Sequence, residues 1–487
     1  MTEERLFRRV AQTSGYAFFG KFGAKLLGLG HWFLLFFLVL EADGFGQFSF
    51  LLAYVGIFSG LAEGGVSGIL VRQLRQTDDE TERRKLFGGS LLLLLLQGTL
   101  FWLILVVAYF LIPSFRVLVE PRVVLMYSTV ILFAPHSACE GVFRASMQLR
   151  VPVYVNLARY GLFLLAINPG GPIDSIAEVV LAWWILMVSG ILVVSFLALR
   201  KLPPLWKGVM STSRSLFRDS APLFFTRLAT VFYYRVDQVM LGLFFADRPE
   251  HLGWYSSAVR WAEALNLIPA ALMEGIYPAL SRVWTESRSA FDSVVRRVWL
   301  LFVGLAGTVV LLLCLLIPIA MAGEFIEALR PAETPLLLLV IAEGFIFLNL
   351  LLFQLLVAAG FQQRLMAVTG TMVVANVLLN LWFFTTFFSG AGHTGAAWST
   401  MLTEALGVGL QICLMRRFLG GTLDRISYLV LCVFVSACCL SLVLYLGLPF
   451  NSPLSESLQV VLIVGWLAWT GWLLKDEVKN LPGLFRQ

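Results

Sequence analysis

The feature that most restricts the fold of this chain is its succession of long apolar segments. A helix needs about 20 mainly apolar residues, at a rise of 1.5 Å per residue, to cross the hydrocarbon core of a bilayer. Segments of this kind recur along the whole sequence, separated by charged residues, prolines and glycine clusters. They predict fourteen membrane-spanning helices, and therefore an all-α polytopic membrane protein. Their approximate ranges are 14–40, 44–70, 86–112, 122–143, 151–168, 176–199, 219–245, 253–280, 295–320, 334–359, 365–388, 394–415, 427–448 and 457–474.

The basic residues give these helices an orientation. If the N-terminus lies in the cytoplasm, the loops on that side hold most of the 36 Lys and Arg residues. The opposite loops then hold only Arg116, Arg122, Arg248 and Arg330. Positive residues collect in the cytoplasmic loops of membrane proteins, and one helix more or less would destroy this alternation. The pattern predicts that both termini are cytoplasmic.

Composition and loop length exclude several classes of protein. Charged residues make up 14% of the chain and hydrophobic residues 59%, whereas a soluble domain carries roughly 25% charged residues. The loops are too short for a soluble catalytic or nucleotide-binding domain. The net charge of +6 follows from the basic loops and does not indicate nucleic acid as a partner.

No cofactor or metal is expected from the motifs either. The six cysteines lie in apolar segments without a C-x-x-C pair, and the four histidines are scattered along the chain. The series Gly15-x-x-x-x-Gly20-Lys21-Phe22 lacks the Ser or Thr of a phosphate-binding loop and belongs to a predicted transmembrane helix.

Charged residues inside the predicted spans indicate a polar interior. A charge at the centre of a bilayer costs at least about 2.5–3.5 kcal/mol, so such residues face a bundle interior or a water-filled cavity. In the seventh and eighth spans they recur at helical spacing, which predicts two stripes that line one polar cavity. The stripes are Arg227, Thr230, Tyr234 and Asp237 in the seventh span, and Ser256, Arg260, Glu263 and Glu274 in the eighth.

A second regularity is a weak internal repeat. Phe45-Gly46-Gln47-Phe48 opens the second span, and Leu252-Gly253-Trp254-Tyr255 opens the eighth, 207 residues and six helices later. Parallel repeats of six helices are typical of transporters. We therefore expect an N-terminal six-helix lobe at 1–200, a cytoplasmic linker at 201–218, a second six-helix lobe at 219–418 and two additional helices at 419–487.

Glycines follow one face of the second span. Gly56, Gly60, Gly64 and Gly68 recur every four residues. Small residues at this spacing allow two membrane helices to approach closely. We expect a packing contact here, without chemistry.

The sequence resembles the bacterial polysaccharide (O-antigen type) flippase family. The resemblance is carried by Arg235-x-Asp237, by Gly253-x-Tyr255 and by the exit Pro278-Ala-Leu-Ser-Arg282. Gly44-Phe45-Gly46-x-Phe48 and Glu63-Gly64-Gly65-Val66 fit as well. The family belongs to the multidrug/oligosaccharidyl-lipid/polysaccharide exporter superfamily, together with lipid II flippases and multidrug/toxin extrusion proteins.

The resemblance implies two six-helix bundles in a V shape around a cationic central cavity. It also implies alternating access that moves an undecaprenyl-diphosphate-linked oligosaccharide from the cytoplasmic to the periplasmic leaflet of the bacterial inner membrane. Such a step serves the biosynthesis of surface polysaccharide, including lipopolysaccharide O-antigen. The implied partners are this lipid-linked oligosaccharide, membrane lipids and glycan polymerase or ligase machinery.

Basic residues at membrane depth are the candidates for binding the diphosphate and glycan. Guanidinium and ammonium groups can replace the lost hydration of a diphosphate with charge-assisted hydrogen bonds. The alternative for each is a structural ion pair, such as Arg260 with Glu263, or a lysine that reaches the interface. The candidates are Arg235, Arg260, Arg227, Lys25 and Arg159.

Acidic residues in the spans are the candidates for ion coupling or gating. Carboxylates at this depth can bind H⁺ or Na⁺ in coupled transporters, and the membrane potential can act on them. The alternative is a salt bridge that holds one conformation. The candidates are Asp237, Glu263, Glu63, Glu343 and Glu404.

Two other functions remain open at this point. An ion-coupled small-molecule or drug antiporter of the same superfamily would be expected to have more acidic than basic residues in its cavity, whereas arginine is prominent in the seventh and eighth spans. A polytopic glycan polymerase, ligase or glycosyltransferase usually carries a large loop or a catalytic domain, and the short loops argue against one. We therefore expect a transporter and not an enzyme.

Overall fold

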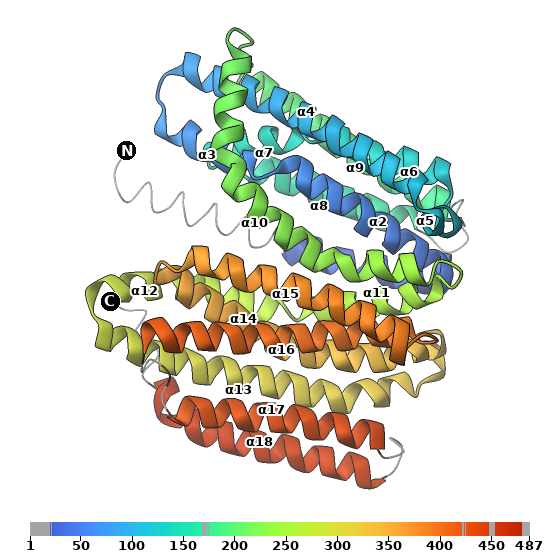
Figure 1. Ribbon diagram of the computed structural model, residues 1–487, viewed down its shortest axis with the longest axis vertical. Coiled ribbons are helices and arrows are strands. Elements are labelled where there is room, and N and C mark those ends of the chain that lie inside the picture. The colour runs from blue at the N-terminus through green and yellow to red at the C-terminus, as the bar shows by residue number, and fades with distance from the viewer. Residues whose placement is uncertain are drawn as a thin grey trace. The chain divides into compact units, whose positions relative to one another are not determined.

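The protein is described by a computed structural model that covers residues 20, 22–167, 173, 175–420, 423, 425–447 and 453–479. Throughout these residues the regular elements are helices (Figure 1). By their internal contacts they form two compact units, Met1–Ser256 and Ser257–Gln487. The boundary lies inside α11 (Glu250–Ala264), so this helix begins in the first unit and ends in the second.

The first unit begins with helical residues 22–34, which continue into the π-helical segment η1 (Leu35–Leu40). Its further elements are α2 (Glu41–Glu63), α3 (Val66–Gln76), α4 (Glu80–Leu111), α5 (Pro113–Leu118), α6 (Pro121–Ser128), η2 (Thr129–Phe133), α7 (His136–Ala145), α8 (Arg150–Ala166), α9 (Ile176–Lys201) and α10 (Val209–Phe244). The long helix α10 packs along α2 and α4, and α3 packs on α7.

The second unit takes up the end of α11 and continues to the last described helix. Its elements are α12 (Leu267–Glu286), α13 (Arg288–Met321), η3 (Glu324–Ala332), α14 (Glu333–Ala358), α15 (Gln362–Trp382), η4 (Phe383–Phe387), α16 (Gly392–Leu419), α17 (Arg425–Gly447) and α18 (Pro453–Lys479). Its centre is α14, which packs on α16 and α13, and α17 and α18 both pack on α13.

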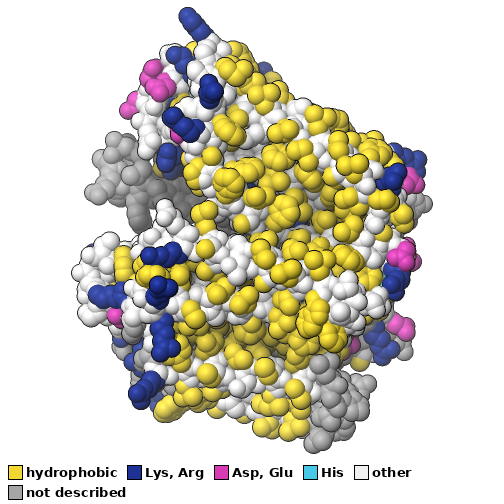
Figure 2. All heavy atoms as spheres, viewed as in Figure 1, with side chains coloured by type: hydrophobic (Ala, Val, Ile, Leu, Met, Phe, Trp, Pro, Cys, Tyr) yellow, Lys and Arg dark blue, Asp and Glu magenta, His cyan; other side chains and the backbone are white. Residues whose placement is uncertain are grey.

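These elements confirm the all-α class. Over the described residues, each of the fourteen predicted spans coincides with one helix or with two or three consecutive helical elements, as the fourth does with α6, η2 and α7. Eight described helical segments are long and apolar enough, by length and composition, to cross a membrane. Within each unit apolar side chains cover the middle of the helices, whereas Lys, Arg, Asp and Glu gather towards the helix ends (Figure 2).

The second predicted span is not one continuous helix, and the prediction is wrong there. The chain turns at Gly64 and Gly65, with φ values of +52° and +78°, and a new helix, α3, begins at Val66. These left-handed conformations strain any residue with a side chain, and glycine adopts them freely. The glycines visible in the sequence therefore end α2.

The predicted glycine contact is confirmed for most of its length, and its partner is α10. A Cβ atom added at Gly60 would lie 2.6 Å from Val231 Cγ2, and one at Gly56 would lie 3.9 Å from Arg235 Nε. At Gly64 the nearest atom belongs to Phe224. Gly68 has no such neighbour within 4 Å, so the prediction is wrong for this residue.

The eighth predicted span, 253–280, is also broken, at Leu265 and Asn266 between α11 and α12. In a continuous helix the Leu265 carbonyl would accept from the N–H of residue 269, but Pro269 has none. This carbonyl instead accepts from the Ile268 N–H at 3.0 Å. The predicted stripe from Ser256 to Glu274 is therefore wrong as one continuous helical face, because Glu274 belongs to α12.

Two positions related by the internal repeat meet in the first unit. A Cβ atom at Gly46 of α2 would overlap the Pro249 carbonyl oxygen, and one at Gly253 of α11 would overlap the Ala42 carbonyl oxygen. The side chains of Asp43 and Glu250, which have the same 207-residue offset, are hydrogen-bonded. We call this contact the α2–α11 junction. By their contacts α10 and the start of α11 belong to the first unit, and the predicted lobes with their linker at 201–218 stay a prediction.

His251 beside the α2–α11 junction gives a pH-dependent prediction. It precedes the eighth predicted span, and its ring packs on Phe245 and Trp254 at centroid distances of 5.2 and 5.5 Å. Burial, and to a smaller extent Arg248, lower the pKa of this imidazole to about 4, although Asp247 opposes the shift. As the pH falls from about 6.5 to about 4, the unfolded chain binds a proton that the folded chain does not.

The folded protein should therefore lose stability across this window and keep it above about pH 6.5. Melting temperatures of the purified protein between pH 7.5 and pH 4 check this. The His251→Gln variant, which has a neutral side chain at both ends of the range, should lose less. An equal loss in both proteins would show that other groups cause it.

Candidate functional site

Two of the predicted substrate-binding arginines approach one buried phenol in the first unit. Arg159 of α8 and Arg235 of α10 both lie within electrostatic reach of the Tyr127 hydroxyl of α6. Arg235 also borders Gly56 of α2, where the absence of a side chain makes room for it. Two arginines from helices distant in sequence thus both act on one buried side chain of the first unit.

Arg159 is held by aromatic and amide groups. Its guanidinium lies over the rings of Tyr160 and Trp183, at 5.1 and 5.4 Å from their centroids. Arg159 Nη2 donates to Asn156 Oδ1 at 2.6 Å. Among the described residues no carboxylate forms an ion pair with Arg159, and its buried Nε has no hydrogen-bond partner. These contacts fix the position of the guanidinium without neutralising its charge.

A cavity of about 700 Å³ lies beside Arg159, within the first unit. We call it the Arg159 cavity. Among its lining residues Glu140 binds Arg144 at 2.6 Å and lies 3.5 Å from His136. Its lining residues are Gly20, His136, Glu140, Arg144, Leu149, Pro152, Val153, Val155, Asn156, Arg159, Met187, Gly190, Ile191 and Val194.

Arg227 and Glu63 form an ion pair between α10 and the end of α2. Arg227 Nη2 lies 3.3 Å from Glu63 Oε2, and Ser67 Oγ donates to Glu63 Oε1 at 2.9 Å. The side chains are 46% and 29% exposed. The two candidates are therefore joined in this conformation, and their roles in binding and coupling stay predictions.

Asp237 connects the two segments that carry the family resemblance. It is buried on α10, and Tyr255 of α11 donates its hydroxyl proton to Asp237 Oδ2 at 2.9 Å. Next to it Gln238 Nε2 donates to Ser256 Oγ at 3.4 Å. Lys25 lies half-buried on the helix 22–34. Lys21, another basic residue in the first predicted span, lies outside the described residues.

In the second unit Arg260 and Glu263 form a pair on α11. Arg260 Nη1 lies 3.2 Å from Glu263 Oε2, and both side chains are mostly covered. This is the pairing named above as the structural alternative for Arg260. Arg235 and Arg260 belong to different units, so a cavity shared between them stays a prediction.

The remaining candidate acids are buried among amides of the second unit. Asn266, at the break between α11 and α12, donates to Glu343 Oε1 at 3.1 Å. Glu404 Oε2 accepts from Asn349 Nδ2 at 2.6 Å, and Gln411 Nε2 donates to Asn349 Oδ1 at 2.9 Å. Sequence reasoning missed these partners. A lone amide in an apolar helix shows no period, and only the packing of α14 on α16 reveals its neighbour.

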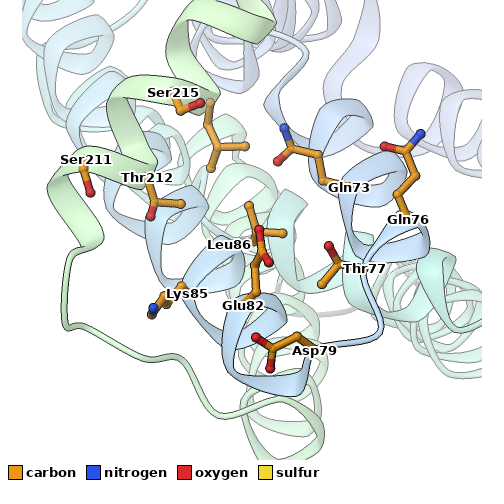
Figure 3. A pocket seen from close by; sticks show the side chains of 11 residues that line it. Gln73, Gln76, Thr77, Asp79, Glu82, Lys85, Leu86, Ser211, Thr212 and Ser215 are labelled. Atoms are coloured by element: carbon orange, nitrogen blue, oxygen red, sulfur yellow. The ribbon is translucent and has the colours of Figure 1, made fainter.

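A second pocket, of about 520 Å³, lies at the turn between α3 and α4 beside the first turns of α10 (Figure 3). Asp79, Glu82 and Lys85 supply its charged groups, and Gln73 Nε2 donates to Asp219 Oδ2 at 3.1 Å. Hydroxyl groups come from α10 and from the α3–α4 turn (Figure 3). With two carboxylates and one amine among its lining residues, this pocket has no excess of positive charge and does not suit a diphosphate.

The fold is that of a multi-pass membrane transporter. The chain is similar to the lipid II flippase MurJ in an inward closed conformation, with a TM-score of 0.69 and 13% identity over 94% of this chain and 99% of that one. It is also similar to an inward-facing multidrug resistance MATE family transporter of the MOP superfamily, with a TM-score of 0.59 and 13% identity over 81% of this chain and 95% of that one. Identities this low show the shared fold alone.

The family follows from the sequence itself. Residues 10–284 match the family model described as polysaccharide biosynthesis protein. The chain belongs to this family, which confirms the resemblance seen in Arg235-x-Asp237 and Gly253-x-Tyr255. A comparison with curated protein sequences finds no match.

Proposed function

We propose that this protein is a flippase that moves an undecaprenyl-diphosphate-linked oligosaccharide from the cytoplasmic to the periplasmic leaflet by alternating access. Membership of the polysaccharide biosynthesis family and the transporter fold support this class of activity. The observation that carries the substrate is Arg159, which lines a cavity of about 700 Å³ and forms no ion pair with a carboxylate among the described residues. Fixed guanidinium groups suit a diphosphate that leaves water.

In this proposal the basic residues have different tasks. Arg159 and Arg235 receive the diphosphate, and Lys25 attracts it from the cytoplasmic side. Arg227 and Arg260 already hold carboxylates. They exchange Glu63 and Glu263 for the head group during the cycle, which couples binding to the release of two ion pairs.

The energy source is assigned to the buried acids. Glu343 and Glu404, with Asp237, Glu63 and Glu263, are the groups on which Na⁺, H⁺ or the membrane potential would act. The protein is placed in the bacterial inner membrane with both termini in the cytoplasm, because the basic loops then lie inside. Glycan polymerase or ligase machinery would take up the product.

Reconstitution tests this function. The purified protein is incorporated into vesicles that carry a labelled undecaprenyl-diphosphate oligosaccharide, and an impermeant lectin or glycosidase reports the glycan that reaches the opposite leaflet. We expect protein-dependent movement that responds to an imposed Na⁺, H⁺ or potential gradient. If no gradient produces movement of the glycan lipid while a fluorescent cation is exported, the protein is an antiporter and the proposal is wrong.

A further inference from the structure

We propose that the Arg159 cavity binds one anionic lipid with a phosphate head group, its phosphate on Arg159 and its chain against the aliphatic side chains of the lining. The cavity lies wholly within the first unit and is lined by α7, α8 and α9 together with Gly20. Binding of a lipid chain in this cavity is a property beyond the proposed function. If the bound lipid is the one that the protein transports, the proposal rests on the proposed function.

The lining combines the two kinds of group that such a lipid needs. Charged and polar groups come from His136, Asn156 and Arg159, among others. Aliphatic side chains come from α8 and α9, including Val153, Val155 and Ile191. The volume of about 700 Å³ lies within the range of about 300–1,000 Å³ typical of ligand pockets. A soluble anion would leave the aliphatic groups uncovered, whereas a lipid can contact both kinds.

The charged residues of the cavity leave an excess of positive charge, which favours an anionic ligand. Among the described residues that line the cavity, Glu140 is the one carboxylate, and Arg144 binds it at 2.6 Å. Arg159 therefore supplies the excess positive charge. Because Arg159 lines the cavity and forms no ion pair with a carboxylate among the described residues, its guanidinium can donate to a phosphate oxygen.

The guanidinium is already held in place for binding. Tyr160 and Trp183 lie against it, and Asn156 accepts from Nη2. A side chain that is fixed before binding loses less conformational entropy when the ligand arrives. The aromatic groups hold the arginine without competing for the phosphate, which a carboxylate would do.

The position of the cavity connects the membrane surface with the interior. Arg144 follows the predicted fourth span, on the side predicted to be cytoplasmic, and Arg150 begins α8. Arg159 lies nine residues further along α8, which is about 14 Å at 1.5 Å per residue. A lipid phosphate can therefore pass from the interface at Arg144 to Arg159, close to the middle of a membrane about 30 Å thick.

Gly190 of α9 supplies a steric test. A Cβ atom there would lie 3.3 Å from Val155 Cγ1 and 4.0 Å from Arg159 Cδ, so a leucine at this position fills the cavity beside the guanidinium. Gly161 of α8 has no neighbouring atom within 4 Å of an added Cβ. Gly161→Leu is therefore the matched control for Gly190→Leu. Met187→Trp fills the same cavity from α9 and replaces Gly190→Leu if that variant does not fold.

Native mass spectrometry of the purified full-length protein measures binding of three lipids: undecaprenyl diphosphate, dioleoylphosphatidylglycerol and zwitterionic dioleoylphosphatidylcholine. One anionic lipid should bind to the wild type and to Gly161→Leu with equal affinity. Gly190→Leu and Arg159→Gln should weaken it at least about tenfold, the size expected for a lost charge-assisted hydrogen bond. Arg159→Lys should recover part of the loss, since it restores the charge.

Comparing the three lipids shows whether the natural ligand of the cavity is the transported lipid or a lipid of the bilayer. Tighter binding of undecaprenyl diphosphate identifies the transported lipid, and equal or tighter binding of phosphatidylglycerol identifies a bilayer lipid; both support the site. Equal binding of phosphatidylcholine, full competition by inorganic phosphate alone, or unchanged binding in folded Gly190→Leu and Met187→Trp would overturn it. The mass-spectrometric assay measures lipid binding and does not depend on transport. Lipid binding to the Arg159 cavity can therefore be established even if the flippase assay shows no movement of the glycan lipid.

Discussion

Alanine at position 235 is expected to reduce surface-polysaccharide export to about a tenth of the wild-type level or less, at normal protein abundance. Arg235 borders the α2–α10 contact at Gly56 and acts electrostatically on Tyr127, in the region that Arg159 also approaches. Removing a hydrogen-bonding charge costs about 1.5–3 kcal/mol, which corresponds to roughly 10–100-fold in binding. Export in a deletion strain that carries each variant, normalised to the protein detected in membranes, measures the effect.

A surface arginine provides the control for this substitution. Arg122 is exposed and pairs with Glu120 at 2.5 Å. Arg122→Ala makes the same chemical change outside the site and should leave export unchanged. Arg235→Lys should recover part of the activity, because lysine keeps the charge but lacks the planar fork of arginine. Unchanged export in both Arg235→Ala and Arg260→Ala would refute the assignment of these residues to the substrate.

The helices could be predicted because their cause is local. A segment that is apolar over about 20 residues must be helical in a bilayer, whatever it packs against. The breaks are harder to predict. Gly64-Gly65 and Pro269 are visible in the sequence, yet glycine and proline also occur within continuous membrane helices. The Gly64-Gly65 turn is accompanied by the close approach of Leu223 of α10, which only the folded unit supplies.

The partners of the charged residues were predictable only within one helix. Arg260 and Glu263 are three residues apart on one helix, so the sequence alone indicates an ion pair between them as the alternative to substrate binding by Arg260. Glu63 meets Arg227 across 164 residues, and Glu404 meets Asn349 across 55. Tyr127, too, lies in a generally apolar segment and looks in sequence like any other buried aromatic residue. Contacts at such separations depend on packing that no periodicity encodes.

The α2–α11 junction gives the prediction with the largest effect on stability. Gly253→Ala should lower the melting temperature of the purified protein by several degrees, because the new methyl group would overlap the Ala42 carbonyl oxygen. Gly46→Ala should act in the same way through the Pro249 carbonyl oxygen. A backbone oxygen cannot rotate aside as a side chain can, so the helices must separate, at a cost of about 1–3 kcal/mol or more.

A glycine-to-alanine substitution at a helical glycine with free space around it should raise stability instead of lowering it. An added Cβ at Gly370 of α15 meets no atom within 4 Å. Gly370→Ala should therefore raise stability slightly, by up to about 1 kcal/mol, through the lower entropy of the unfolded chain. The double variant at Gly46 and Gly253 should lose less than the sum of the two single losses, since helices separated by the first methyl group already accommodate the second. Strict additivity would mean that the two glycines do not share one contact.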